Sequence, residues 1–201
     1  DAVTYLDANP DVVAAFGYFQ QVDADGQVIR PASVAARATW ARWPAQGLRD
    51  RMVFENIVPA VCTVVRSAVH EHIPPFPIDN PLAHDFCQWY LLSLHGDFAQ
   101  LNRPVLNYRV HDASLSQSIL RFERYGREMN HAFSSLMAWP GLSEHDRTQL
   151  RRGQIRSRIR YARMGQVWRP VLDEPRRWTT WQDLAENMQE RVRHRLARRQ
   201  N

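Results

Sequence analysis

The sequence predicts an α/β region followed by a bundle of about three helices. Two apolar, β-branched runs, residues 12–22 and 58–66, have the length and composition of buried strands. Later in the chain the apolar residues recur at three- and four-residue spacing instead, which is typical of amphipathic helices. The charge changes as well, because residues 1–118 hold 8 Arg and 12 acidic residues, whereas residues 119–201 hold 18 Arg and 9 acidic residues. We therefore expect two parts that meet near residue 118.

The N-terminal elements follow from local patterns. Residues 1–9 predict a short helix that Asp1 caps and that Asn9-Pro10 ends. The strand at 12–22 leads through a turn at residues 23–26 into a return strand. The next expected elements are a loop or weak helix at 31–47, a short helix at 48–56, the strand at 58–66, a short helix at 67–72 and a proline-rich loop.

The C-terminal elements begin with a helix at residues 82–94, which Gly96 stops. Residues 98–110 predict one or two strands broken at Pro104, and residues 111–118 predict a polar loop. The apolar stripes of the three helices that follow run through Phe122, Tyr125, Met129, Phe133 and Leu136, through Leu150, Ile155, Ile159 and Ala162, and through Trp181, Leu184, Met188, Val192 and Leu196. Capping boxes that open the last two helices are expected at Ser143 with Asp146 and at Thr180 with Asp183.

The composition favours a folded protein of the reducing compartment. Of the 201 residues, 44% are hydrophobic, which is enough to bury a core. Cys62 and Cys87 both lie in apolar runs, so we expect small buried thiols and neither a disulfide nor a metal site. No apolar run reaches the length of a membrane span. We expect a cytoplasmic protein, and because the chain opens at Asp1 within a helical pattern, we expect its biological start to lie further upstream.

Three segments stand out as an ordered series. They are YLDANPDVVAAFGYFQQVDADGQVI at residues 5–29, ENIVPAVCTVVRSAV at residues 55–69 and AHDFCQWYLLSLHGDFAQLNRPVLNYRVHDASLSQS at residues 83–118. The first joins an Asn-Pro helix end to a strand and a polar turn, and the last places an acidic helix start before a Gly turn, a strand and a Tyr-Arg-x-His sequence. In this order they resemble the acceptor-side, C-terminal half of a family-2 glycosyltransferase of the GT-A fold.

The resemblance implies both a fold and an activity. The fold would be part of a GT-A mixed sheet, and the activity would be transfer of a sugar from a nucleotide-sugar donor to a saccharide or lipid-linked acceptor, in the synthesis of surface polysaccharide or glycoconjugate. A non-processive, inverting enzyme is favoured, because the processive Q-x-x-R-W signature is absent from the sequence. The resemblance also implies a divalent cation, Mn²⁺ or Mg²⁺, whose main ligands and the nucleotide-binding strands would lie upstream of Asp1.

Asp85 is the residue to which the resemblance assigns general-base catalysis. A base of this kind removes the proton of the acceptor hydroxyl as it attacks the anomeric carbon. Helix-terminal N–H groups are expected to keep the carboxylate ionised. The family usually has Glu-Asp where this chain has His84-Asp85, so His84 would orient or tune the base. The alternative from local chemistry alone is that Asp85 is an ordinary acid at a helix start.

Four further residues are candidates for contact with substrate or metal. Arg109 would pair with the diphosphate, because a guanidinium binds phosphate in a bidentate manner. His111 would ligate the metal or contact the diphosphate, and the alternative is a loop histidine packed on the strand. Thr63 and Arg66 lie on the expected acceptor strand, where substrate contact and a structural role are both open.

The Arg-rich helices leave three functions open. They are solvated faces of a helical cap, a surface that docks on the anionic inner face of the cell membrane, or a nucleic-acid-binding tail. Nucleic acid is disfavoured, because acidic residues interrupt the arginines and no nucleic-acid-binding signature is present. The alternative function for the whole chain is a non-enzymatic helical interaction module with a basic tail that binds membrane or nucleic acid.

Overall fold

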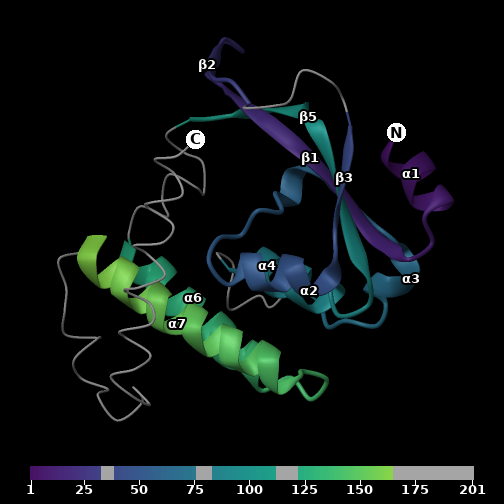
Figure 1. Cartoon of the computed structure of the whole chain (residues 1–201). Helices are drawn as coiled ribbons and strands as arrows, with labels where there is room; N and C mark the ends of the chain where they lie inside the picture. The colour runs from purple at the N-terminus through teal and green to yellow at the C-terminus, as the bar shows by residue number, and fades with distance from the viewer. Residues whose placement is uncertain (33–38, 76–82, 112–121, 165–201) are drawn as a thin grey trace, which may run out of the picture.

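A mixed sheet of five strands forms the centre of the protein. The structure, a computed structural model, describes residues 1–32, 39–75, 83–111 and 122–164 (Figure 1). The helices in these residues pack on both faces of the sheet, with most of them on one side. The expected α/β class is therefore confirmed, whereas the GT-A assignment stays a prediction.

Strand β1 (Val12–Val22) is the central strand of the sheet. It pairs in parallel with β5 (Asp97–Arg109) along one side. Along its other side it pairs antiparallel with β4 (Thr63–Val65) and then with β2 (Val28–Arg30). Strand β3 (Trp40–Trp43) closes the far side of the sheet by pairing antiparallel with β5.

The helices cover the sheet in chain order. They are α1 (Ala2–Ala8), α2 (Ala45–Met52), the 3-10 turn η1 (Ala60–Cys62), α3 (Ser67–His70), α4 (His84–Leu92), α6 (Phe122–Met137) and α7 (Glu144–Met164). None of these helices is both long and apolar enough to cross a membrane. Helices α6 and α7 lie side by side and pack against the α2–α4 side of the sheet (Figure 1).

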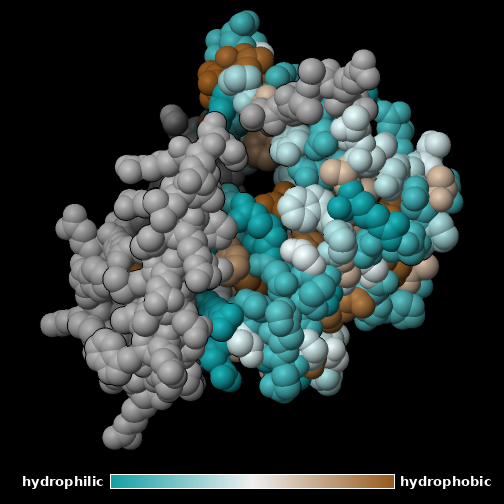
Figure 2. All heavy atoms as spheres, viewed as in Figure 1, coloured by the Kyte–Doolittle hydropathy of each residue, from teal (hydrophilic) through white to brown (hydrophobic). Residues whose placement is uncertain are grey.

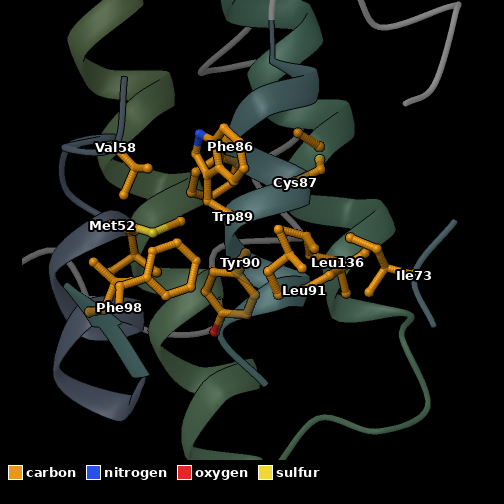
Figure 3. Close-up of a cluster of buried hydrophobic side chains, with 14 of the residues drawn as sticks. Met52, Val58, Ile73, Phe86, Cys87, Trp89, Tyr90, Leu91, Phe98 and Leu136 are labelled. Carbon is orange, nitrogen blue, oxygen red and sulfur yellow. The ribbon is translucent and has the colours of Figure 1, made fainter. Parts of the chain in front are cut away.

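The main core lies between the sheet and helices α2, α4, α6 and α7. Figure 3 shows that the side chains of α4 reach toward Met52 of α2, Phe98 of β5 and Leu136 of α6. As a result, the residues of α4 that follow Asp85 are buried, and Tyr90 has no exposed surface. A smaller cluster on the opposite face packs α1 on β1 and β5 through Leu6, Val12, Ala15 and Ala99.

The helices α6 and α7 belong to the same core as the sheet. Phe133 of α6 and Leu150 of α7 are buried in one cluster with Val13 of β1. The division into residues 1–118 and 119–201 stays a prediction, but hydrophobic packing in the described residues crosses it. The predicted third helix, its Thr180–Asp183 capping box and the Arg-rich tail lie outside those residues.

A buried ion pair links α2 to α7 inside this core. Arg49 Nε donates to Asp146 Oδ1 at 2.8 Å, and its Nη1 donates to the Ser93 carbonyl at 2.6 Å. The predicted capping box at Ser143 and Asp146 is confirmed, because Ser143 Oγ donates to Asp146 Oδ2 at 2.6 Å and the Asp146 N–H returns to Ser143 Oγ at 3.1 Å. Burial raises the pKa of Asp146, but the bonds from Ser143 and Arg49 outweigh it, and the pKa is lowered.

Several local predictions are confirmed and several are corrected. The strand at 12–22 and the turn at Gly26, whose φ is +85°, are as expected. The strand predicted at 58–66 is wrong in extent, because only Thr63–Val65 pairs with β1. The predicted strand break at Pro104 is also wrong, because β5 continues through Pro104 as one strand. Pro104 pairs with Tyr18 of β1, and the register of the β1–β5 pairing shifts on either side of Tyr18.

The segment 31–47 contains the largest error of the sequence-based assignment. It was expected to be loop or weak helix, yet Trp40–Trp43 forms β3 against residues 98–101 of β5. The helix expected at 48–56 begins earlier, at Ala45, because Asp97 Oδ1 accepts the Ala45 N–H at 2.8 Å. Both corrections depend on β5, which lies far along the chain: β3 pairs with it, and the start of α2 is bonded to its Asp97 side chain.

The far end of the sheet has an apolar surface. Val28 and Ile29 of β2 are 50% and 55% exposed, and Val105 of β5 is 46% exposed. Figure 2 shows the hydrophobic surface at the tip of the molecule where β2 lies.

The cysteines are both free thiols, and Cys87 is buried as predicted, whereas Cys62 is half-buried.

Candidate functional site

Asp85 lies in the first turn of α4, next to Phe86 of the main core. Its side chain is half-buried. The Phe86 N–H donates to Asp85 Oδ1 at 2.7 Å, and Asn56 Nδ2 donates to Asp85 Oδ2 at 3.1 Å. Ala83 occupies the N-cap of α4 and has no side-chain oxygen to accept a hydrogen bond. Asp85 is the one acidic residue in the first turn of this helix. The carboxylate is therefore held at two oxygens by neutral donors.

The electrostatic setting of Asp85 makes its carboxylate more basic. Burial raises the pKa of Asp85, and this effect exceeds the opposing effects of the Phe86 N–H, His84 and Asn56, which lower it. The Phe86 N–H at the start of the helix lowers the pKa of Asp85, as expected, but the effect of burial is larger. A carboxylate with a raised pKa accepts a proton more readily, which suits a general base.

The neighbouring His84 is half-buried at the first position of α4. Its charge lowers the pKa of Asp85, so it partly offsets the effect of burial. That His84 orients or tunes a catalytic base stays a prediction.

Asn56 is the residue of this site that the sequence analysis missed. Besides donating to Asp85, it accepts the Val58 N–H at its Oδ1 over 3.2 Å, and this second bond fixes the orientation of the amide. Asn56 belongs to the segment 55–69 that carries the resemblance. A polar residue ahead of an apolar strand was the available signal, but nothing local indicated that it would meet the start of α4.

A cavity of about 260 Å³ opens beside this pair. It lies between the residues that follow α2, the start of α4 and the paired helices α6 and α7. Asn56 and Phe86, the two residues that hold the Asp85 carboxylate, both line it. Its other lining residues are Met52, Val53, Phe54, Glu55, Tyr125, Met129, Phe133, Gly153, Arg156, Ser157 and Arg160.

Thr63 and Arg66 have structural partners. Thr63 Oγ1 donates to the Pro59 carbonyl at 2.7 Å. The Arg66 guanidinium donates to the carbonyls of Val12 at 2.8 Å and Asn9 at 3.1 Å, and also to that of Leu6. It thereby ties the end of α1 to the start of β1. These contacts favour the structural alternative that the sequence left open for both residues.

Arg109 and His111 lie at the C-terminal end of β5, and both are exposed. Arg109 Nη1 donates to the Ala24 carbonyl, which places it beside the turn that follows β1. Strand β5 spans about 40 Å at roughly 3.3 Å per residue, and α4 lies at its opposite end. Among the described residues, neither Arg109 nor His111 contacts Asp85, so the structure does not gather the predicted site residues into one group.

The described residues do not by themselves form a cation site. They contain no group of three or more histidine, cysteine, aspartate or glutamate side chains arranged to hold a metal ion. His111 therefore stays a predicted ligand, and the divalent cation stays an expectation.

Comparison with known proteins leaves the resemblance as the basis for any assignment. No family model matches the chain, and no curated protein matches it. The resemblance to family-2 glycosyltransferases therefore stays a prediction from the three sequence segments.

Proposed function

We propose that the chain forms the acceptor side of an inverting, non-processive glycosyltransferase in which Asp85 is the general base. One observation carries the proposal: a half-buried carboxylate with a raised pKa is fixed by Asn56 and the Phe86 N–H at the edge of a cavity. Such a carboxylate is suited to general-base catalysis. The mixed α/β fold is compatible with the family that the sequence resembles.

The reaction assigns one proton transfer to Asp85. The acceptor hydroxyl forms a bond to the anomeric carbon of the donor while its proton passes to the Asp85 carboxylate. The bond from that carbon to the nucleoside diphosphate breaks, and the diphosphate leaves with the electron pair. General-base assistance of this kind accelerates transfer by about 10²–10⁴-fold. Asn56 keeps the carboxylate aimed, because its own amide is held by the Val58 N–H.

The partners follow from the reaction. They are a nucleotide-sugar donor and a saccharide or lipid-linked acceptor. When bound, the divalent cation would neutralise the charge that develops on the leaving diphosphate. Arg109 is not placed at that diphosphate, because it lies at the opposite end of β5 from α4 and its guanidinium donates to the Ala24 carbonyl.

The test is the Asp85→Asn variant of the full-length protein. Release of nucleoside diphosphate from UDP-, GDP- and dTDP-sugars is measured with a saccharide acceptor panel. We expect Asp85→Asn to reduce turnover by about 10²–10⁴-fold, because the amide cannot accept the proton, while the donor still binds. Asp50→Asn, at an exposed carboxylate on α2, is the matched control. Turnover retained in Asp85→Asn would remove Asp85 from the base role.

A second variant separates positioning from a structural effect. Asn56 lowers the pKa of Asp85, so Asn56→Ala removes that influence and raises the pKa further. The acidic limb of the pH–rate profile is then expected to move to higher pH, because the base is protonated over a wider range. An unmoved limb with a uniformly lower rate would assign Asn56 to folding alone.

A further inference from the structure

Helix α7 packs against the loop that carries Asn56 at two points, in addition to its buried ion pair with α2. Gly153 lies so close to this loop that a Cβ on it would be 2.7 Å from the Val53 carbonyl oxygen. The Arg156 guanidinium lies over the Phe54 ring, 4.8 Å from the ring centroid. Because Gly153 and Arg156 are three residues apart on a helix, they share a face. This face of α7 therefore contacts both of the residues that directly follow α2.

Asn56 lies two residues beyond Phe54, where the chain has no regular structure. Residues 55–57 belong to no helix or strand. The bond from Asn56 Nδ2 to Asp85 Oδ2 is 3.1 Å long, whereas a contact of about 3.6 Å is no longer a hydrogen bond. A displacement of Asn56 by about 0.5 Å is therefore enough to release the carboxylate. The bond depends on how accurately residues 55–57 are held.

This short stretch is anchored at both of its ends. At one end, Val58 is 1% exposed in the main core, and its N–H donates to Asn56 Oδ1 at 3.2 Å. At the other end, the Phe54 ring packs against the main core and lies under the Arg156 guanidinium. A cation held over an aromatic ring in this way is an attractive contact. Helix α7 thus supplies one of the two anchors.

The other surroundings of the stretch provide little support. The ion pair between Arg51 and Glu55 contributes little, because the two side chains are 41% and 59% exposed and water screens their attraction. On another side the stretch borders the cavity of about 260 Å³, since Phe54 and Asn56 both line it. Asn56 therefore has space to move if the contact with α7 is lost.

We propose that Arg156 is a positioning residue for the general base: its guanidinium holds Phe54 and thereby keeps Asn56 within hydrogen-bonding distance of Asp85. The role of Asp85 as the base rests on the proposed function, whereas the mechanical link from α7 to the Asp85 carboxylate does not. Helix α7 then controls the orientation of Asp85 without touching the reacting atoms. A change that moves α7 away from this loop releases the carboxylate from its amide donor.

The first test removes the aromatic ring and leaves every charge in place. Phe54→Leu is compared with the native sequence by NMR of the protein with isotope-labelled aspartate carboxyl groups. The Asp85 signal is the one that is lost in Asp85→Asn. We expect Phe54→Leu to raise the pKa of Asp85, because Asn56 lowers that pKa and is no longer held in reach. An unchanged titration of Asp85 would overturn the proposal.

Two controls accompany this test. Phe19→Leu removes a half-buried ring from the far part of β1 and should leave the titration of Asp85 unchanged. The same shift in Phe19→Leu would show a general loosening of the fold and overturn the proposal. His84 and Cys87, whose charges or titrations are coupled to Asp85, are retained in every variant. Thermal unfolding verifies that each variant is folded.

The second test changes the cation. Arg156→Met removes the guanidinium, whereas Arg156→Lys keeps a cation that can also lie over an aromatic ring. We expect Arg156→Met to raise the pKa of Asp85 and Arg156→Lys to restore most of the native titration. Arg151→Gln, at an exposed arginine of the same helix, is the control and should have no effect. A shift in Arg156→Met with none in Phe54→Leu would indicate a direct effect of charge and overturn the positioning role.

A double variant checks that the two residues act through one contact. Phe54→Leu combined with Arg156→Met should shift the titration no further than the larger of the single changes, because both break the same contact. Additive shifts would contradict the proposal. In the transfer assay each single variant is expected to lower turnover by about tenfold, since a misplacement of about 1 Å costs up to about 10²-fold.

The outcome is separable from that of the proposed function. If Asp85→Asn retained transfer while Phe54→Leu raised the pKa of Asp85, the base assignment would fail and the link from α7 would stand. If Asp85→Asn abolished transfer while Phe54→Leu left the titration unchanged, the base would stand and the link would fail.

Discussion

Asp85 and Asp146 occupy similar positions and have opposite properties. Both lie in the first turn of a helix and both are shielded from solvent. Asp146, with a side chain 4% exposed, accepts hydrogen bonds from Ser143 and from the Arg49 guanidinium, and its pKa is lowered. Asp85 accepts from the neutral amide of Asn56 and one backbone N–H, and its pKa is raised.

The two carboxylates differ in the donors that their oxygens meet. Burial raises both pKa values, yet only at Asp146 do a cation and a hydroxyl reverse the effect. Asp146 therefore stabilises the junction of α2 and α7. Asp85 has a donor at each oxygen, but both donors are neutral, so the effect of burial on its pKa prevails.

The strongest way to break this comparison is Asp146→Asn. The substitution leaves the Arg49 guanidinium buried without its anionic partner, so we expect the free energy of unfolding to fall by about 3–5 kcal/mol. Urea denaturation at pH 7 measures the loss. The solvent-accessible contact between Asp50 and His145 provides the control, since Asp50→Asn should change stability by less than about 1 kcal/mol. A small effect at Asp146 would mean that Arg49 finds another partner.

The Asp146 pair should also weaken in acid. Its lowered pKa means that the stabilisation is present above the unfolded-state value of about 3.9 and is lost as the pH falls through the folded-state value. The gap in unfolding free energy between the native sequence and Asp146→Asn should therefore shrink in acid.

A smaller effect is expected from Gly153→Ala on α7. A Cβ at this position would lie 2.7 Å from the Val53 carbonyl oxygen and 2.8 Å from the Phe133 ring, so α7 must move away from the loop that carries Asn56. Overpacking of this kind costs about 1–3 kcal/mol. Gly47→Ala on α2 is the control, because nothing lies within 4 Å and the helix should gain up to about 1 kcal/mol. Equal behaviour of the two variants would show that α7 is not tightly docked.

The smallest expected change, and the one of opposite sign, is at Asp85 itself. Because its folded-state pKa is raised, ionisation destabilises the fold as the pH rises past the unfolded-state value near 3.9, and the penalty persists at neutral pH. Asp85→Asn should therefore raise the free energy of unfolding at pH 7 by about 0.5–2 kcal/mol. The gain should vanish at about pH 3, where Asp85 is protonated. A loss of stability at pH 7 would indicate that Asp85 serves the fold.

The elements predicted correctly from sequence are those whose signals are local. Strand β1 has a continuous apolar run, α6 has a regular stripe, and α7 opens with a capping box whose two partners are three residues apart. Strand β3 could not be predicted, because Trp40–Trp43 becomes a strand only through its pairing with β5. The early start of α2 likewise depends on Asp97, which lies on β5.

The candidate site also contains residues that the sequence could indicate and residues that depend on contacts between distant segments. The sequence resemblance pointed to Asp85, and the structure places it at a helix start with a raised pKa. The direction of that shift depends on burial, which no local pattern contains. Asn56 was missed because its bond to Asp85 joins residues from separate elements. The carbonyl partners of Arg66, on Leu6, Asn9 and Val12, also lie far from it in the sequence, so no local pattern could choose between its two open roles.

The parallel pairing of β1 with β5 has a consequence for biosynthesis. Gly17 of β1 pairs with Leu101 of β5, so the central strand cannot meet its main neighbour until most of the described chain has been made. At about 5–20 residues per second, a nascent β1 waits on the order of ten seconds for that partner. During this interval its apolar side chains are accessible to chaperones and to other nascent chains. The residues that form the centre of the finished sheet are thus the ones most exposed to aggregation while the protein is being translated.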